Sequence, residues 1–211
     1  MKVDKPKISK VLENKDFDQI FDEDDCMLEL CVIDRAVFEN EAMDRVRLYN
    51  SVFRNCRFAN TDFSNIDLMD VCFENCDFSN ANLSDASIHR VEFHGCKFVG
   101  TNFPASSFGN VRFVECVINL SSFANSKLKK VVFDNVVARG VYFYDCKFTG
   151  VLFDTCCLDE TNFFRTSLKG VDISSCTFDS LQVSLEELNG CKVSSLQAVQ
   201  FAGLMGLTVI D

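Results

Sequence analysis

Apolar side chains recur at every fifth position over most of this chain. The series begins at Leu28, ends at Val183 and never loses phase, and Ala138 is its only small member. Two positions before nearly every member stands a smaller residue, usually Cys, Ala, Val, Ser or Thr. A period of five is neither the 3.6 of a helix nor the alternation of a strand. The pattern therefore predicts a repeat in which each five-residue unit buries one large and one small side chain.

The small positions carry a second period of 20 residues, which predicts how the units are arranged. The columns are Cys56, Cys76, Cys96, Cys116, Cys156 and Cys176, and Val71, Val91, Val111, Val131, Val151 and Val171. Four units therefore complete one coil, and residues 20 apart stack on one another. We expect an all-β, four-sided solenoid of about eight coils over residues 26–185, with short β-like sides. Asn at the last place of many units, such as Asn55, Asn60 and Asn80, suits the turns because its side chain bonds locally to backbone.

This arrangement accounts for an unusual composition. The chain of 211 residues contains 22 Phe and 12 Cys but no Trp, and only 2 Pro and 9 Gly. Of the Phe residues, 18 belong to the five-residue series. A slot that takes Phe and a slot that takes Cys, filled again and again, explain this bias.

The repeat resembles that of the pentapeptide-repeat family, in which a small residue, Asp or Asn, Leu or Phe, and two polar residues follow one another. Residues 61–65 (Thr-Asp-Phe-Ser-Asn) and 76–80 (Cys-Asp-Phe-Ser-Asn) fit that pattern well. The resemblance covers about three quarters of the chain. It implies the right-handed quadrilateral β-helix of that family.

The N-terminal segment, residues 1–25, does not keep the register. Its part from residue 16 to residue 25 is acidic and contains Phe17, Ile20 and Phe21. We expect these three side chains to cover the first coil, because the ends of a solenoid must be capped; the alternative is an arm that binds a partner. Glu41 occupies a small inward position, where we expect a bulge or an outward turn rather than a buried charge.

The C-terminal segment, residues 186–211, changes period. Ser184 and Glu187 form a capping box, a second helix is predicted from about 195 to 205 with Ala198, Phe201, Ala202 and Met205 on one face, and residues 207–210 are predicted as a short strand. The apolar residues exceed what a cap needs, and the last coil has an open edge, so we expect a symmetric homodimer. Its expected interface comprises Ala198, Val199, Phe201, Ala202, Leu204, Met205, Leu207 and Val209.

A closer resemblance lies in the same segment. Residues 190–193 (Gly-Cys-Lys-Val), 197–198 (Gln-Ala) and 206–210 (Gly-Leu-Thr-Val-Ile) are similar to the C-terminal signature of the Qnr fluoroquinolone-resistance proteins, and so are residues 168–174. That resemblance implies a dimer that protects DNA gyrase and topoisomerase IV from quinolones by resembling DNA. The five-residue phase is unbroken here, as in the members of that family that lack loops.

The distribution of charge indicates which side of the rod would bind a partner. With 21 basic and 31 acidic residues the net charge is −10, which opposes direct nucleic-acid binding and favours a cationic partner. The expected partner-binding side carries Glu74, Glu92, Glu115, Asp134, Asp154 and Asp172 against Arg112. A basic side carries Lys127, Lys129, Lys130, Lys147 and Lys169. The alternative is that these charges only keep the rod in solution.

Chemistry that would indicate an enzyme is missing from the sequence. Cys in the small slot is a packing residue, whereas Cys72 and Cys157 fall one place later and should point outward, where they could oxidise. His89 and His94 should lie on the surface, and neither a phosphate-binding loop nor a nucleophile motif occurs. We therefore expect no catalytic residue, no cofactor and no metal. With no membrane span and no signal sequence, we expect a cytoplasmic protein.

The sequence thus supports two functional hypotheses. The first is a non-enzymatic protein that binds DNA gyrase and topoisomerase IV and protects against fluoroquinolones. The second is an interaction scaffold for another protein.

Overall fold

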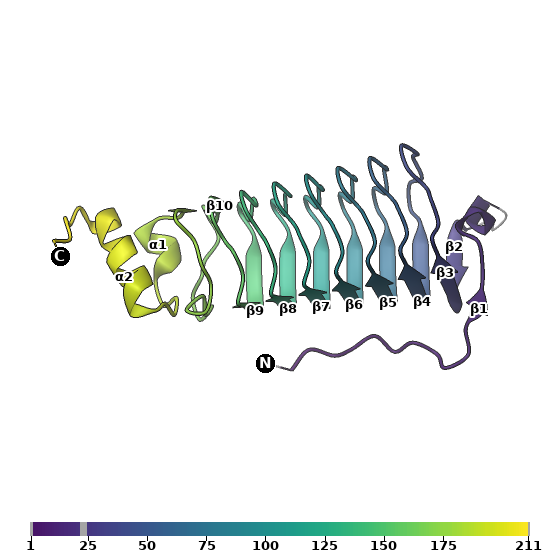
Figure 1. Ribbon diagram of the computed structural model, residues 1–211, viewed down its shortest axis with the longest axis horizontal. Coiled ribbons are helices and arrows are strands. Elements are labelled where there is room, and N and C mark those ends of the chain that lie inside the picture. Colours follow the sequence, from purple (N-terminus) through teal and green to yellow (C-terminus); the bar gives the residue numbers. More distant parts are fainter. Residues whose placement is uncertain (1, 22–24, 211) are drawn as a thin grey trace.

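The computed structural model describes residues 2–21 and 25–210 and has the shape of a rod (Figure 1). Six strands of eight residues stack in parallel along it: β4 (Arg47–Arg54), β5 (Asp67–Glu74), β6 (Ser87–His94), β7 (Ser107–Val114), β8 (Lys127–Asp134) and β9 (Lys147–Asp154). Each pairs with the next at a shift of 20 residues, as in Phe53 with Phe73. The predicted β-solenoid of four five-residue units per coil is confirmed.

Each coil has four sides, which are numbered here in chain order. Side 1 is centred on Leu48 and the residues 20 apart from it, side 2 on Phe53, side 3 on Phe58 and side 4 on Phe63. The long strands span sides 1 and 2, whereas sides 3 and 4 are held by isolated bridges between turns. Shorter strands lie toward the ends: β1 (Glu13–Asn14), β2 (Met27–Glu29) and β3 (Cys31–Asp34), then β10 (Thr161–Asn162) and β11 (Leu181–Gln182).

Columns of stacked rings fill the rod. On side 2 the ring centroids of Phe73 and Phe93 are 5.2 Å apart, and those of Phe93 and Phe113 are 4.9 Å apart, with nearly parallel planes. The neighbouring column meets it edge to face, as Phe98 does at 90° to Phe93. Both geometries are favourable for aromatic pairs. Phe148 is the one Phe of the series that is only partly buried.

The corners of the coils require the left-handed backbone conformation. Almost every fifth residue has a positive φ, for example Asn60 at 57° and Asn80 at 57°. Asn tolerates this region better than most residues. Its side chain bonds along the rod rather than locally, because Nδ2 of Asn80 donates to Oδ1 of Asn60, and Nδ2 of Asn60 donates to Asn40. Asn thus favours the corner for a reason other than the expected local bond to backbone. Glu41, in contrast, turns outward and is exposed, as expected.

The N-terminal end of the rod is plugged by a short 3₁₀ helix, η1 (Phe17–Phe21). Phe17 and Ile20 are buried, and the ring centroid of Phe17 lies 4.9 Å from that of Phe38. Phe21 is 61% exposed, and its ring centroid lies 5.9 Å from that of Phe38, so it covers the first coil only in part. Residues 22–24 of the acidic segment lie outside the described residues.

The first residues of the chain form an extended arm along the rod (Figure 1). The backbone amide of Lys7 donates to Oδ1 of Asp70 at 2.8 Å, and that of Asp4 donates to Oδ1 of Asn110 at 3.1 Å. Asp70 and Asn110 are corner residues between sides 1 and 2. The arm therefore follows this corner from the N-terminal end toward the middle of the solenoid.

The C-terminal end is closed by helices. The capping box of Ser184 and Glu187 is present and begins α1 (Leu185–Leu188). After α1 the chain rejoins the stack, because the amide of Gly170 donates to the carbonyl of Gly190 and the amide of Ile173 to that of Lys192. The stacking thus extends past residue 185, where the repeat was expected to end, because α1 takes the place of one side of a coil.

The second helix, α2 (Ser195–Phe201), leads into a 3₁₀ turn, η2 (Ala202–Met205), and no strand follows within residues 207–210. The predicted final strand is therefore wrong, since these residues pair with no neighbouring coil. The predicted apolar face is wrong in part: Ala198 and Met205 are exposed, and Gln197 is the buried residue. Within the described residues no helix is both long and apolar enough to cross a bilayer.

Candidate functional surfaces

The acidic residues expected to bind a partner lie on the outside of side 2, one in each of six successive coils, and are called the acidic column below. They occupy neighbouring rows rather than a single row, because Glu74 pairs with His94 whereas Glu92 pairs with Cys72, and Glu115 is a corner residue. Three of them have partners: Nε of Arg54 is 2.8 Å from a carboxylate oxygen of Glu74, and Nη2 of Arg112 is 3.3 Å from one of Asp134. Nε2 of His94 is 3.0 Å from a carboxylate oxygen of Glu92. The two arginines reduce the negative potential of the column at Glu74 and at Asp134.

The other three acidic residues, Glu115, Asp154 and Asp172, form no ion pair in the described residues, although Lys192 pairs with Asp172 in register in the next coil. The hydroxyl and amide of Ser174 hydrogen-bond to Asp172 and lower the pKa of its carboxyl. Asp154 accepts a hydrogen bond from the hydroxyl of Thr155. Carboxylates without an ion pair thus remain at three of the six coils that the acidic residues span.

Arg112 is not the only cation on this side, as the sequence had suggested, because Arg35, Arg54 and Lys192 lie there too. Their positions could have been read from the register, because Arg54 and Glu74 are 20 residues apart. Carboxylates that recur once per coil are spaced by about 4.8 Å, whereas DNA carries a charge per roughly 1.7 Å. The density of negative charge along one side of the rod is thus lower than that along DNA.

The lysines of the basic side lie on side 1. Lys127, Lys129 and Lys130 belong to β8, and Lys147 of β9 pairs with Lys127 in register. Lys169 lies two coils beyond Lys129 on the same side. Because β4–β9 turn the corner between sides 1 and 2, the basic and acidic sides adjoin along that corner.

The residues expected at a dimer interface divide into two groups. Phe201 and Ala202 are used within the chain, and the ring of Phe201 lies 5.5 Å from that of Phe178. The others are exposed: Ala198, Val199 (48%), Leu204 (43%), Met205 (57%), Leu207 (58%) and Val209 (53%). Leu196 and Ile210 are also exposed and were missed, although Leu196 precedes Val199 by three residues and so shares its helix face. The C-terminal end thus presents a contiguous run of apolar side chains.

Two family models match the sequence. "Pentapeptide repeat region" matches residues 86–163, and "Pentapeptide repeats (8 copies)" matches residues 34–75, 47–85 and 66–103. Together they cover residues 34–163. The chain belongs to the pentapeptide-repeat family.

Solved structures of other pentapeptide-repeat proteins resemble this one. A trypsin-treated variant of QnrB1, a plasmid-mediated fluoroquinolone resistance protein, is 21% identical, with 87% of this chain and 90% of that chain covered and a TM-score of 0.49. HetL, involved in heterocyst differentiation regulation in the cyanobacterium Nostoc sp. strain PCC 7120, is 10% identical, with 78% and 88% covered and a TM-score of 0.42. No curated protein matches the sequence significantly.

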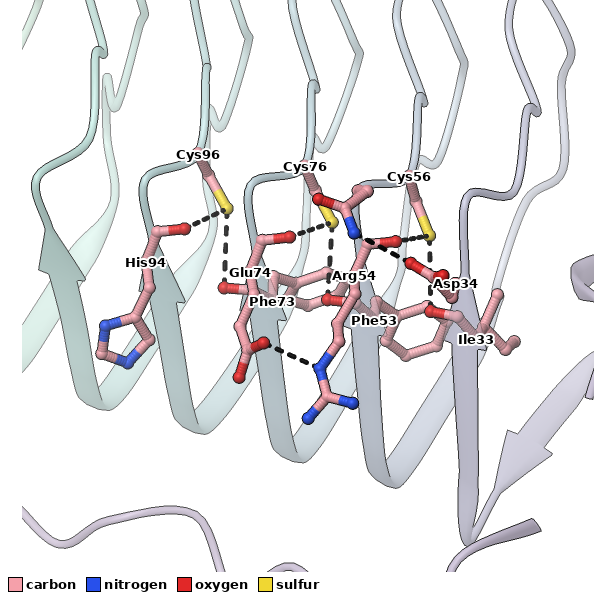
Figure 2. Close-up of polar contacts among 11 residues, drawn as sticks. Ile33, Asp34, Phe53, Arg54, Cys56, Phe73, Glu74, Cys76, His94 and Cys96 are labelled. Atoms are coloured by element: carbon pink, nitrogen blue, oxygen red, sulfur yellow. Dashed lines mark hydrogen bonds and ion pairs between the residues drawn. The ribbon is translucent and has the colours of Figure 1, made fainter. Parts of the chain in front are cut away.

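The cysteines of this pentapeptide-repeat protein form columns inside the rod (Figure 2). The thiols of Cys56, Cys76 and Cys96 donate to the carbonyl oxygens of Ile33, Phe53 and Phe73 in the preceding coil, at 3.6–3.7 Å. Burial raises the pKa of Cys96, and it raises that of Cys146 to about 12. All twelve cysteines lie within the described residues and have free thiols. These inward thiols act as small packing residues.

The two cysteines outside the columns are half-buried rather than fully outward. Burial, with Glu74 and Glu92 nearby, raises the pKa of Cys72 to about 12. A thiol with a raised pKa reacts more slowly with oxidants, which disfavours oxidation of Cys72 relative to a fully exposed thiol. His89 and His94 are half-exposed, and no group of three potential metal ligands occurs in residues 2–21 or 25–210.

Proposed function

We propose that this protein binds type II topoisomerases, DNA gyrase and topoisomerase IV, through the acidic column of side 2 and thereby protects them from fluoroquinolones without acting as an enzyme. The observation that carries the proposal is the series of carboxylates along side 2 at Glu115, Asp154 and Asp172, none of which forms an ion pair with a basic side chain among the described residues. A surface that holds DNA is cationic, and such a series is complementary to it. The similarity of residues 190–210 to Qnr proteins supports the choice of enzyme.

A second copy of the chain would extend the acidic column. The exposed apolar residues Val199, Leu204 and Leu207 lie at the C-terminal end of the rod. Contact between two such ends about a two-fold axis would bury these residues and join the two rods end to end. The proposed homodimer would thereby present two acidic columns, which compensates for the low charge density of one.

The proposal is tested by gyrase supercoiling in the presence of ciprofloxacin. We expect the wild-type protein at micromolar concentration to restore supercoiling, and we expect the variant Glu115→Lys/Asp154→Lys/Asp172→Lys to lose this effect. The matched control is Glu41→Lys/Asp85→Lys/Glu160→Lys, which reverses three exposed charges on other sides. No rescue by the wild type, or equal loss in both variants, would contradict the proposal.

The homodimer is tested by light scattering on a sizing column. One chain has a mass of 23.8 kDa, and we expect twice that mass for the wild type. Val199→Asp/Leu204→Asp should give single chains, whereas Leu120→Asp, which changes an exposed apolar residue on side 3, should leave the dimer intact. Phe201 is unsuited to this test because it packs against Phe178 within the chain. A wild type of single-chain mass would refute the dimer.

An aromatic patch favours the second hypothesis, an interaction scaffold for another protein. Tyr142, Tyr144 and Phe164 lie on the outside of side 4 and are 37–48% exposed. The guanidinium of Arg165 lies 5.7 Å from the ring centroid of Tyr144. Aromatic residues and Arg are the types enriched at the centres of protein interfaces. Capture of a partner other than a topoisomerase, lost in Tyr144→Ala and Phe164→Ala but kept in the acidic-side variant, would support this function instead.

A further inference from the structure

Side 1 contains a hollow of about 540 Å³ between β6 and β8. Its floor is Gly109, beside the half-exposed His89 of the preceding coil. A Cβ at Gly109 would lie only 2.6 Å from Nδ1 of His89, so the absence of a side chain there lets the imidazole lie across the strand. Lys127, Lys129 and Lys130 form the wall toward the C-terminal end. The pair of His89 and Gly109 thus makes room on the surface of side 1 beside these lysines.

The charge of the hollow is opposite to that of the chain. The described residues that line it include three lysines but neither Asp nor Glu. Lys147 extends the positive charge by one coil, because it pairs with Lys127 in the sheet. The chain has 31 acidic and 21 basic residues, so a hollow lined by three lysines and no carboxylate is more basic than the chain as a whole. Positive charge concentrated in a concave surface attracts an anionic partner.

The chain itself supplies a carboxylate to the edge of this hollow. Oδ2 of Asp4, in the N-terminal arm, lies 3.8 Å from Nζ of Lys130. The backbone amide of Asp4 donates to Oδ1 of Asn110, which also lines the hollow. The N-terminal arm is therefore itself an extended polypeptide bound at this place, with a carboxylate at Lys130 and a backbone amide at Asn110. Both groups of the ion pair are about half exposed, so an intermolecular competitor could replace the contact at little cost.

We propose that the hollow of side 1 binds an extended acidic polypeptide segment of a partner protein, whose carboxylates contact Lys127, Lys129 and Lys130 in competition with Asp4. A polypeptide fits better than a nucleic acid, because the contact that the chain makes to itself is that of a peptide and because a net charge of −10 repels a polyanion as large as DNA. The site lies on a different side from the acidic column and takes a partner of opposite charge. The proposal for this hollow therefore does not depend on the proposed binding to topoisomerases.

The test measures fluorescence anisotropy of a fluorescein-labelled peptide that alternates Asp and Ser, with about 10 residues so that, extended, it spans the hollow and the next coils. We expect saturable binding to the full-length protein at low ionic strength, and a loss of about tenfold in affinity in Lys127→Ala/Lys129→Ala/Lys130→Ala. The matched control, Arg57→Ala/Lys97→Ala/Arg139→Ala, removes three charges from side 3, and its affinity should stay within about twofold of the wild type. Asp4→Asn should tighten binding by about twofold, because it removes the competing carboxylate.

Several results would overturn the proposal. One is the absence of saturable binding to the wild type, and another is an equal loss of affinity in the two triple variants, which would mean that only net charge matters. A third is binding of a labelled DNA duplex as tight as that of the peptide and with the same dependence on the three lysines. Weaker binding of the peptide to Asp4→Asn would contradict the competition. Circular dichroism of each variant establishes that the solenoid is intact.

Discussion

Both ends of the rod need a cap over the core and the open sheet edge, and the two caps use different side-chain chemistry. At the N-terminal end, β1 continues the sheet, since the amides of Glu13 and Lys15 donate to carbonyls of β3 and its flank, and the ring of Phe17 closes the core. At the C-terminal end, the amide side chain of Gln197 closes the core and donates to the carbonyls of Ile173 and Cys176, both at 2.8 Å. A parallel sheet has an open edge at each end, so a cap must satisfy backbone groups as well as cover apolar side chains.

The two ends also differ in which apolar side chains they leave exposed. The N-terminal cap is apolar and adds an arm that lies along the rod, and the large apolar side chains that stay exposed near it are Val11, Phe21, Leu30 and Val37. The C-terminal cap presents a polar residue to the core and turns its apolar residues outward, including Leu196, Leu207 and Ile210. The C-terminal end thus exposes more large apolar side chains, and at positions closer together in the sequence, than the N-terminal end does.

The largest effect is expected from removing the aromatic plug. Phe17 lies within 6.5 Å, between ring centroids, of four other rings, so Phe17→Ala should lower the free energy of unfolding by about 3–5 kcal/mol. Urea unfolding followed by circular dichroism measures it. The control is Phe21→Ala, four residues away and 61% exposed, which should change stability by less than about 1 kcal/mol. Equal effects of the two substitutions would mean that Phe17 does not close the core.

An intermediate effect is expected at the polar plug. Gln197→Leu keeps the volume of the side chain but leaves the carbonyls of Ile173 and Cys176 without their donor, which should cost about 1–3 kcal/mol. The same urea titration measures this loss. Gln200→Leu is the matched control: its amide donates to the carbonyl of Phe178 at 3.3 Å from an exposed position, so its loss should be smaller. A Gln197→Leu variant as stable as the wild type would show that this end is closed by apolar packing alone.

The repeating coils could be predicted from the sequence alone, whereas the two ends could not. Five-residue spacing decides which side chains point inward, so the coils, their register and the buried Cys columns follow from it. The ends do not follow, because they depend on contacts between distant residues, such as that of Asp4 with Asn110 across 106 positions. Gln197 was not predicted as buried, since an apolar periodicity gives no weight to a polar residue that satisfies carbonyls. The ion pairs of side 2 could have been found by adding 20 to each position, as for Arg54 and Glu74.

The smallest effect is expected where the N-terminal arm meets the rod. Asp70 is buried at the corner, with its two carboxylate oxygens each 2.6 Å from a guanidinium nitrogen of Arg90, and it accepts the amide of Lys7. Removing the charge in Asp70→Asn should weaken the attachment of the arm and raise hydrogen exchange at the Lys7 amide by about tenfold, which mass spectrometry detects. Asp85→Asn, an exposed corner residue, is the control and should leave exchange at Lys7 unchanged.

Acidification should reproduce the effect of Asp70→Asn in the wild-type protein. The guanidinium of Arg90, and then the amide of Lys7, hold the pKa of the Asp70 carboxyl below its ordinary value. A carboxyl whose pKa is lower in the folded than in the unfolded state contributes its stabilisation above the unfolded pKa of about 3.9 and loses it as the pH falls through the folded pKa. Attachment of the arm should therefore persist at pH values above about 4 and weaken below that in the wild type, but not change with pH in Asp70→Asn. A variant whose arm still detaches with acid would assign the pH dependence to another carboxyl, such as Asp4 at Lys130.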